Sequence, residues 1–179
     1  RNRERVDKAA DLAAGDWVLF LGADDRLLAD MKEVIKEFHD KNTLYYGNAY
    51  WPDRNTAYDG PFARGKLART NICQQAILYP KAALEKYRHN TRYRTQADWE
   101  LNMRCFSDPA FKFKYIPVTI AQYNDVDGAS TRNRDLNLEN DYIALMWRYF
   151  PWPVALWRTA IALGGKFLRA VGLKKKLDL

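Results

Sequence analysis

The sequence predicts an α/β fold, and three consecutive segments near its start carry that prediction. Residues 3–14 are rich in Arg, Glu, Lys and Ala, which favour a helix, and Gly15 is typical of a residue that ends one. Residues 16–21 form a nearly continuous apolar run, typical of a strand buried on both faces in a parallel sheet. After an acidic turn, apolar residues at helical spacing predict an amphipathic helix over 27–38. Together these segments indicate an α/β domain.

Further elements follow in the same way along the chain. Strands are expected at 43–51 and 111–123, the second with a break at Pro117, and a strand or a helix at 72–79. Pro, Asp, Asn and Gly predict a loop or hairpin over 52–66. We expect helices at 80–87, 95–106 and 136–150 and, after a break at 151–153, a last helix from 154 to the end. The expected division is a domain portion at 1–135 and a helical tail at 136–179.

Composition narrows the class of protein. The chain has 179 residues, of which 47% are hydrophobic, which suits one globular domain and argues against wholesale disorder or a collagen-like chain. Two cysteines and two histidines do not favour a disulfide framework or a zinc cluster. The formal charge of +7 favours anionic partners. Because the chain starts without Met inside a predicted helix, we expect an N-terminal part to precede it.

Two adjacent carboxylates, Asp24 and Asp25, follow the apolar strand. Ligands of open α/β sheets bind beyond the carboxyl ends of strands. A pair of carboxylates there suits a hard divalent cation that bridges to substrate phosphates. The alternative is that these residues cap the helix predicted to start near Leu27.

The segment Ala14-Gly-Asp-Trp-Val-Leu-Phe-Leu-Gly-Ala-Asp-Asp25 resembles the "A-x-G-[DE]-[YW]-[IV]-x-F-L-[DN]-A-D-D" segment of family 2 glycosyltransferases. The resemblance implies a GT-A fold, a three-layer α/β/α sandwich that is incomplete here at its N-terminus. It also implies a nucleotide-sugar donor whose diphosphate, with Mn²⁺ or Mg²⁺, lies at Gly22, Ala23 and Asp24. Gly22 departs from the Asp or Asn of the family, and Asp25 is the residue expected to compensate as a second metal ligand.

The segment Ala97-Asp-Trp-Glu-Leu101 resembles the "[ED]-D-[YW]-E-[LF]" helix start of the same family. This implies that Asp98 is the general base of inverting sugar transfer, taking the proton of the acceptor hydroxyl. Glu100 is the second candidate. The alternative is structural, because Thr95-x-x-Asp98 is also a helix-capping pattern.

Two further segments resemble the family. Residues 70–79 match its acceptor-side stretch, which implies that Asn71, Gln74 and Gln75 bind acceptor hydroxyls, although such residues also satisfy loop backbone. Residues 123–134 match its "Y-x-x-x-G-x-S" loop. Arg132 and Arg134 are therefore candidates for the donor diphosphate, or else part of a solvated basic loop. Among the aromatic residues of 45–62, Trp51, Tyr58 and Phe62 are the expected ligand contacts, with Trp51 on the acceptor side.

The tail combines an apolar face with a basic stripe. The stripe, within residues 154–176, consists of Arg158, Lys166, Arg169 and Lys176. Such a helix suits an anionic membrane surface, while the alternative is a helix packed on the domain. The expected location is therefore cytoplasmic and peripheral at the inner face of the membrane.

These observations predict an inverting enzyme of cell-surface polysaccharide biosynthesis that moves a single sugar to a glycan or lipid-linked hydroxyl. Single transfer is favoured because the Gln-x-x-Arg-Trp signature of processive synthases is missing from the sequence. The rival hypothesis is a non-catalytic basic module that binds a membrane or nucleic acid. Nucleic acid is not expected, since the sequence has no recognised nucleic-acid-binding motif.

Overall fold

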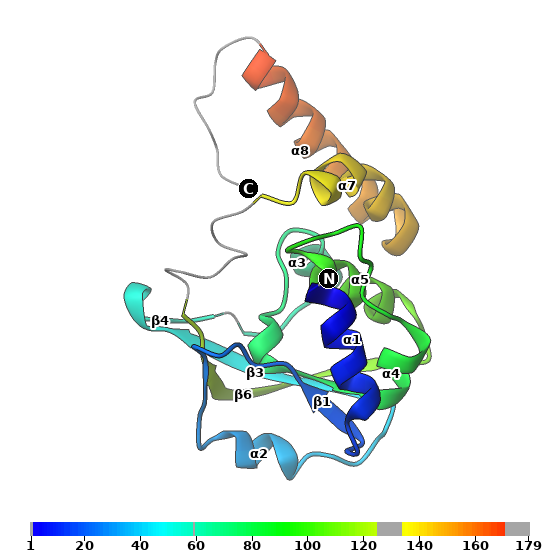
Figure 1. Cartoon of the computed structure of the whole chain (residues 1–179). Coiled ribbons are helices and arrows are strands. Elements are labelled where there is room, and N and C mark those ends of the chain that lie inside the picture. The colour runs from blue at the N-terminus through cyan, green and yellow to red at the C-terminus, as the bar shows by residue number, and fades with distance from the viewer. Residues whose placement is uncertain (1, 59, 125–133, 171–179) are drawn as a thin grey trace.

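The centre of the molecule is a six-stranded sheet in a computed structural model that describes residues 2–58, 60–124 and 134–170. The strand order is β1-β5-β3-β6-β2, and β4 pairs separately with β3 (Figure 1). The strands are β1 (Trp17–Leu19), β2 (Arg26–Leu27), β3 (Thr43–Trp51), β4 (Thr56–Tyr58), β5 (Ile77–Pro80) and β6 (Lys112–Gln122). The sheet confirms the predicted strands at 43–51 and 111–123 almost to their bounds.

Strand directions place three chain segments at one edge of this sheet. β3 and β6 are parallel neighbours, whereas β5 runs antiparallel to both β1 and β3. β1, β3 and β6 therefore all point the same way, and their carboxyl ends meet at the same edge. The expectation that the first strand is of the parallel type, buried on both faces, is wrong. β1 is only partly buried, and its one neighbour among the described residues is the antiparallel β5.

Helices cover both faces of the sheet, as expected for an α/β fold. α2 (Met31–Ile35) lies on one side (Figure 1). The other side carries α1 (Asn2–Leu12), α3 (Arg64–Leu67), α4 (Lys81–Lys86) and α5 (Ala97–Ser107). Each face has its own hydrophobic core, and successive β3 residues enter different ones: Tyr46 belongs to the core that contains Leu101, and Tyr45 to the core that contains Val34. The sheet is thus the middle of three layers.

The predicted helix over 27–38 is largely wrong. Only Met31–Ile35 is helical, and Leu27 instead belongs to β2, where it pairs with Ala121 of β6. The backbone N–H of Leu28 also donates to the carbonyl oxygen of Ile120 at 2.8 Å. Backbone hydrogen bonds to the edge of β6 have overridden the helical spacing, and Ile35 consequently lies more than half exposed.

Pro117 does not interrupt β6, contrary to expectation. The strand continues from Lys112 to Gln122, and the β3–β6 register shifts between Tyr46 and Ala49. At this irregularity a Cβ on Gly47 would lie 2.6 Å from the carbonyl oxygen of Val118, so the close approach of the two strands requires glycine.

Two long helices, α7 (Leu136–Tyr149) and α8 (Trp152–Ala170), form the upper part of the molecule in Figure 1. Asp135 caps α7 by accepting a hydrogen bond from the Leu138 N–H at 3.3 Å. The core of the α5 side includes Leu138, Met146 and Ala155, so α7 and the first turn of α8 share it. No helix in the described part of the chain is long and apolar enough to cross a membrane.

The exposed basic stripe expected on the tail is wrong at Arg158. This residue is buried, and its Nε donates to the hydroxyl of Tyr142 at 2.6 Å. The side chains of Lys166 and Arg169, and the whole of Lys176, lie outside the described residues.

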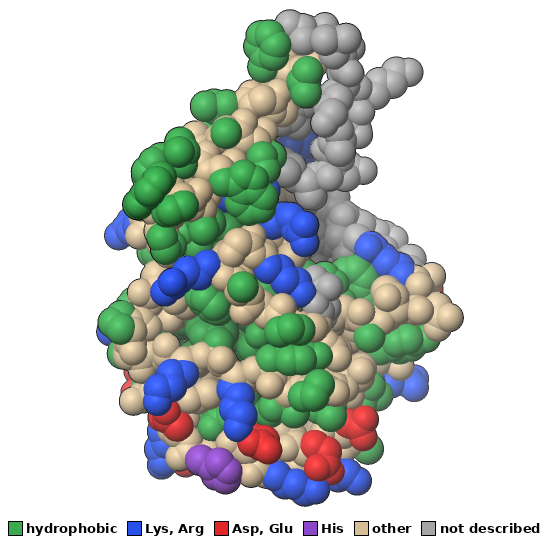
Figure 2. Space-filling model, turned by 180° about the vertical axis from the view of Figure 1, so that it is seen from behind, with side chains coloured by type: hydrophobic (Ala, Val, Ile, Leu, Met, Phe, Trp, Pro, Cys, Tyr) green, Lys and Arg blue, Asp and Glu red, His purple; other side chains and the backbone are tan. Residues whose placement is uncertain are grey.

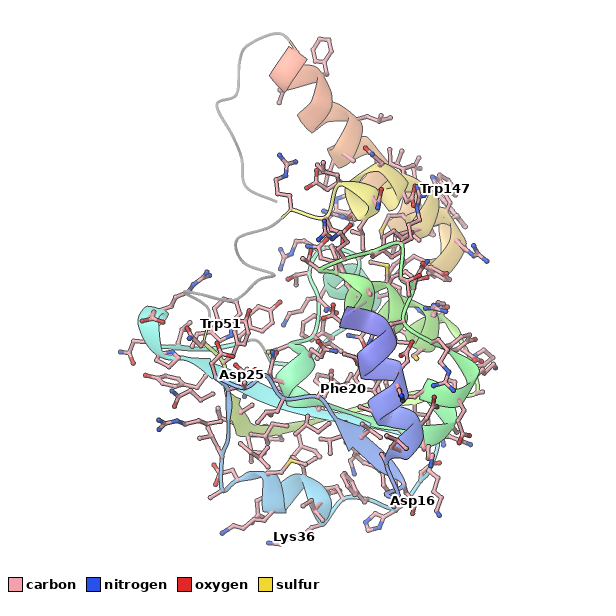
Figure 3. All side chains as sticks on the ribbon, viewed as in Figure 1. Asp16, Phe20, Asp25, Lys36, Trp51 and Trp147 are labelled. Carbon is pink, nitrogen blue, oxygen red and sulfur yellow. The ribbon has the colours of Figure 1, made fainter. Side chains whose placement is uncertain are left out.

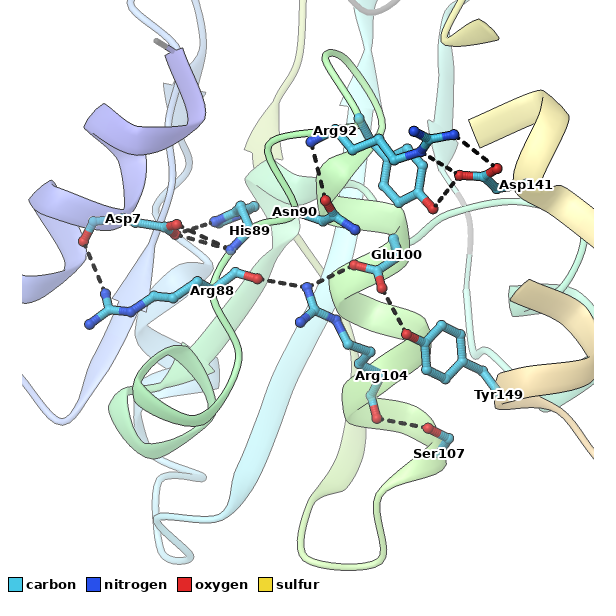
Figure 4. A network of polar contacts seen from close by, with 11 residues as sticks. Asp7, Arg88, His89, Asn90, Arg92, Glu100, Arg104, Ser107, Asp141 and Tyr149 are labelled. Carbon is cyan, nitrogen blue, oxygen red and sulfur yellow. Dashed lines mark hydrogen bonds and ion pairs between the residues drawn. The ribbon is translucent and has the colours of Figure 1, made fainter. Parts of the chain in front are cut away.

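A polar network ties α1 and α7 to the α5 region (Figure 4). The buried ring of His89 contacts the Asp7 carboxylate of α1 at 2.6 Å. Buried Glu100 of α5 pairs with Arg104 at 2.7 Å and accepts a hydrogen bond from the Tyr149 hydroxyl at 2.9 Å. Burial and the Glu100 carboxylate raise the pKa of Tyr149, so the hydroxyl stays a donor. These contacts fix the orientation of α5, from which Asp98 projects.

Candidate functional site

The carboxyl ends of β1, β3 and β6 bring the candidate site residues together. Asp25 follows β1, Trp51 ends β3, and Tyr123 and Asn124 follow β6. Figure 3 shows Asp25 and Trp51 close to each other at this edge. The backbone N–H of Tyr123 donates to the carbonyl oxygen of Tyr50 at 2.9 Å, and the rings of Trp51 and Tyr123 are 6.0 Å apart. The edge is the position at which α/β proteins bind ligands.

The acidic turn is held in shape by its own hydrogen bonds and by the end of β6. Asp25 Oδ2 accepts the Gly22 N–H at 2.9 Å, and Asp25 Oδ1 accepts the Asn124 N–H at 3.2 Å. The side-chain amide of Asn124 reaches Asp24 Oδ2 at 3.3 Å. The capping alternative does not apply, because α2 begins at Met31 and no side chain caps it. Asp25 therefore fixes the turn and Asp24 is presented from it.

Gly22 and Asp25 are sterically linked. A Cβ on Gly22 would lie 2.6 Å from Asp25 Oδ2. The Asp25 carboxylate thus occupies the space into which a side chain at position 22 would project. Glycine at position 22, where the motif has Asp or Asn, thus leaves room for the Asp25 carboxylate.

The donor set at this turn suits a cation that is shared with a ligand. No group of three or more His, Cys, Asp or Glu side chains able to hold a metal lies within the described residues. The exposed Asp24 is a single carboxylate on a fixed turn. Mg²⁺ is commonly bound by one or two carboxylates plus substrate phosphates rather than by an all-protein cage. Asp24 fits that mode, and Asp25 as a second ligand remains a prediction because both of its oxygens accept backbone N–H groups.

Asp98 lies at the end of a directed chain of hydrogen bonds. The Tyr79 hydroxyl donates to Asn102 Oδ1, Asn102 Nδ2 donates to Asn71 Oδ1, and Asn71 Nδ2 donates to Asp98 Oδ2. Each of the three distances is 2.8 Å. Tyr79 and Asn102 are fully buried. Because each amide has its oxygen and nitrogen assigned by its neighbours, the chain fixes a donor toward the Asp98 carboxylate.

The start of α5 does not use Asp98 as a cap. The N-cap residue is Gln96, and no side chain caps the helix there. The backbone N–H groups of Thr95 and Gln96 instead donate to Asp135 Oδ2, at 2.9 and 3.2 Å. The backbone N–H of Thr95, which Asp98 would accept in a capping box, is thus bound by Asp135. Glu100, the second candidate for the base, is buried in the network of Figure 4.

Cys73 connects the two acidic positions. Burial, and after it the charges of the nearby Asp98 and Asp25 carboxylates, raise the pKa of the Cys73 thiol to about 12. Since both charges act on one thiol, the acidic turn and the start of α5 both lie near residue 73. The site residues predicted at 24–25 and 98 are therefore brought into one region.

The expected acceptor-side residues lie around this region. The ring of Trp51 stacks on Tyr58 at 4.7 Å, and the Arg54 guanidinium lies 4.5 Å from its centroid. Two buried donors, Trp51 Nε1 and Gln74 Nε2, have no hydrogen-bond partner within the described residues. Buried donors without partners are rare in folded proteins and suit a ligand that brings oxygen atoms. Gln75 differs, because its Oε1 accepts a contact from Cys73 Sγ at 3.1 Å.

Other predicted site residues lie elsewhere. Arg132 falls outside the described residues, and Arg134 pairs with Glu139 of α7 at 2.7 Å. That both arginines bind the diphosphate of the sugar donor remains a prediction. Phe62 lines a cavity of about 160 Å³ with Phe106, Phe111 and Phe113. Phe113 lies near the start of β6, at the opposite end of the strand from the acidic turn.

Sequence reasoning missed Asn124, Asn102 and Tyr79. Asn102 had a usable signal, since it follows Asp98 by four residues and so lies on the same face of α5. Asn124 directly follows the long β6, whose end was expected to be near the ligand. Tyr79 carried no signal, because a tyrosine in an apolar strand is typical of a core residue.

The structure is that of an α/β protein with carboxylates at the sheet edge where such proteins bind ligands. Comparison with known proteins indicates which reaction this class of protein catalyses. The chain is 40% identical over 134 residues to the "PGL/p-HBAD biosynthesis glycosyltransferase" of Mycobacterium bovis (strain BCG / Pasteur 1173P2), with 71% of this chain and 52% of that protein covered. The protein of the same name from Mycobacterium tuberculosis (strain ATCC 25177 / H37Ra) gives the same values. The chain spans about half the length of these curated relatives. No protein-family model matches it.

Proposed function

We propose that this chain is part of a family 2 glycosyltransferase of GT-A fold, which transfers a single sugar with inversion. The donor would be a nucleotide-diphospho-sugar and the acceptor a hydroxyl of a glycan or a lipid-linked molecule. The similarity to proteins named as glycosyltransferases supports sugar transfer. The observation that carries the proposal is the Asp98 carboxylate, positioned by Asn71 at 2.8 Å near the acidic turn.

The reaction needs one proton acceptor on the acceptor side. Asp98 takes the proton of the acceptor hydroxyl while that oxygen attacks the anomeric carbon of the donor. The bond from this carbon to the diphosphate oxygen breaks, and its electron pair leaves with the nucleoside diphosphate. Attack from the side opposite the leaving group inverts the configuration. A divalent cation, Mn²⁺ or Mg²⁺, at Asp24 would neutralise the charge of the leaving diphosphate.

The remaining residues would bind and orient. Asn71 would hold the Asp98 carboxylate in position through its 2.8 Å hydrogen bond, so we propose for it a positioning role in place of the sugar contact that the sequence predicted. Trp51 Nε1 and Gln74 Nε2 would donate to oxygens of the bound ligand. Asp25 and Asn124 would keep Asp24 in place. Gln75, Arg132 and Arg134 complete the proposed ligand contacts.

The location that suits a lipid-linked acceptor is a membrane surface. We therefore place the activity at the cytoplasmic face of an anionic membrane, with the protein bound peripherally. The relatives are named for PGL/p-HBAD biosynthesis, and an acceptor of the same class is the natural first choice for this chain.

The metal-binding part is tested by Asp24→Asn. Binding of a panel of UDP-, GDP- and dTDP-sugars is measured by calorimetry with Mn²⁺ and with chelator. The variant is expected to lose at least about tenfold of the Mn²⁺-dependent affinity, because a neutral amide is a poor ligand for a hard cation. Asp30→Asn is the matched control, since Asp30 is exposed nearby and its side chain caps nothing. Unchanged affinity in Asp24→Asn would place the metal elsewhere.

A further inference from the structure

The exposed side chains that the structure describes on α8 are all apolar. Between Trp152 and Leu168, the described residues classed as exposed are Trp152, Pro153, Leu156, Trp157, Ala160, Ile161, Leu163, Gly164 and Phe167. None of them is charged or polar. Trp152 and Phe167 expose 69% and 66% of their surface. At 100° per residue these positions cover about half of the helix circumference. A face of this size without polar residues is unusual on the surface of a monomer.

The opposite side of α8 is fixed to the rest of the molecule. Ala155 is fully buried, and Arg158 donates to the Tyr142 hydroxyl of α7 at 2.6 Å. A Cβ on Gly65 of α3 would lie 3.8 Å from the Trp157 ring, so α3 lies next to the apolar face. The helix cannot turn this face inward without losing those contacts. Its apolar side is therefore a permanent outer surface.

Basic side chains lie on the elements beside this face, and the two acidic residues of α7, Glu139 and Asp141, are paired with Arg134 and Arg92. No Asp or Glu occurs between Tyr142 and Ala170. Arg148 of α7, Arg64 of α3 and the nearby Arg69 are exposed. In the view of Figure 2, blue Lys and Arg side chains lie beside the green side chains of the upper part of the molecule, and the red side chains in view lie toward the opposite end. A protein partner would need an acidic surface to match the exposed arginines, whereas an anionic lipid surface provides one by its nature.

We propose that α8 lies flat on an anionic bilayer, with its apolar face in the boundary between headgroups and acyl chains. Trp147, Trp152 and Trp157 supply the amphipathic rings that favour this boundary. Arg64, Arg69 and Arg148 contact the headgroup phosphates. The element that binds lipid is thus the apolar face, and Arg158, which the sequence had assigned to the membrane, instead attaches α8 to α7. The proposal gives the proposed transferase a fixed orientation on its membrane, but its test involves no sugar.

The test is co-sedimentation of the protein with vesicles of phosphatidylcholine containing phosphatidylglycerol, compared with phosphatidylcholine alone. The test variant carries Trp152→Gln, Leu156→Gln and Leu163→Gln, which all lie within one narrow arc of the exposed face. The matched control carries Leu12→Gln, Leu27→Gln and Ile35→Gln, which are exposed by 78%, 50% and 54% but lie on α1, β2 and α2. All six positions are exposed, so neither variant removes a core residue.

The expected result is binding to the anionic vesicles that weakens with salt and falls by at least about tenfold in the α8 variant, with the control like the original protein. Brominated acyl chains should also quench the tryptophan fluorescence of the original protein. Equal binding of the two variants, or no binding to any vesicle, would overturn the proposal. Light scattering that shows a dimer lost only in the α8 variant, without vesicle binding, would assign the face to a second copy of the chain instead.

Discussion

Asn71→Ala removes the one donor that the hydrogen-bond chain directs at Asp98. The lost bond, at 2.8 Å, joins a neutral amide to a carboxylate. Hydrogen bonds to charged groups contribute about 1.5–3 kcal/mol, and each 1.36 kcal/mol in a barrier is about tenfold in rate. If the whole contribution acts on the base, kcat falls by roughly 10- to 150-fold. Because the bond holds one carboxylate oxygen in place, its loss is expected to lower kcat more than it raises the KM of either substrate.

The assay separates positioning from substrate binding. Initial rates of sugar transfer are measured against donor, acceptor and pH for Asn71→Ala and for the control Asn137→Ala. Asn137 also donates a side-chain hydrogen bond at 2.8 Å, but to the carbonyl oxygen of Arg92 near α7. A raised KM for the acceptor with unchanged kcat would restore the sugar-contact role that the sequence predicted for Asn71. An unchanged kcat with only a lower melting temperature would refute the positioning role.

Two further predictions concern stability and thiol chemistry. Asp108 accepts hydrogen bonds from Lys86, Tyr87 and the Ala110 N–H, and the Lys86 bond is the main cause of its lowered pKa, so the stability that Asp108 contributes is present above its unfolded pKa and is lost as pH falls through its folded pKa. Asp108→Asn should therefore lower the free energy of urea unfolding by about 1–2 kcal/mol at pH 7 and by almost nothing in acid. An equal loss at both pH values would contradict this prediction. Burial raises the pKa of Cys73 and Cys105 to about 12, so at pH 8 both should react with Ellman's reagent on the order of a thousandfold more slowly than an ordinary thiol, and rapid reaction of either in the folded protein would be inconsistent with the structure.

Local sequence signals predicted the long elements well. The strands β3 and β6 and the helix α5 were predicted to within a few residues, because aromatic and branched runs and helical spacing act over many positions. α2 was overestimated because Leu27 has a partner, Ala121, that lies far along the chain. Strand direction also escaped prediction, since an apolar run such as β1 reads alike whether its neighbour is parallel or antiparallel.

In the candidate site too, local motifs could be predicted from the sequence but contacts between distant residues could not. Asp24 and Asp98 were visible because each lies in a compact motif. The hydrogen bonds that give them their roles join Asn71 to Asp98 and Asn124 to Asp24, over 27 and 100 residues. Such contacts depend on how strands and helices meet in space, which no local pattern encodes. The same holds for the residues before α5, because Asp135 accepts the backbone N–H groups of Thr95 and Gln96 across 40 and 39 residues.

The assignment of Asp98 as the base of sugar transfer is tested by the variant Asp98→Asn. For this variant kcat, donor affinity and melting temperature are measured together. Asn preserves the shape of the side chain but cannot take the acceptor proton. If Asp98 is the base, we expect kcat to fall by roughly 10²–10⁴-fold, with donor affinity and melting temperature nearly unchanged. A variant that keeps its kcat and loses only thermal stability would show that Asp98 is a structural residue and would contradict the account.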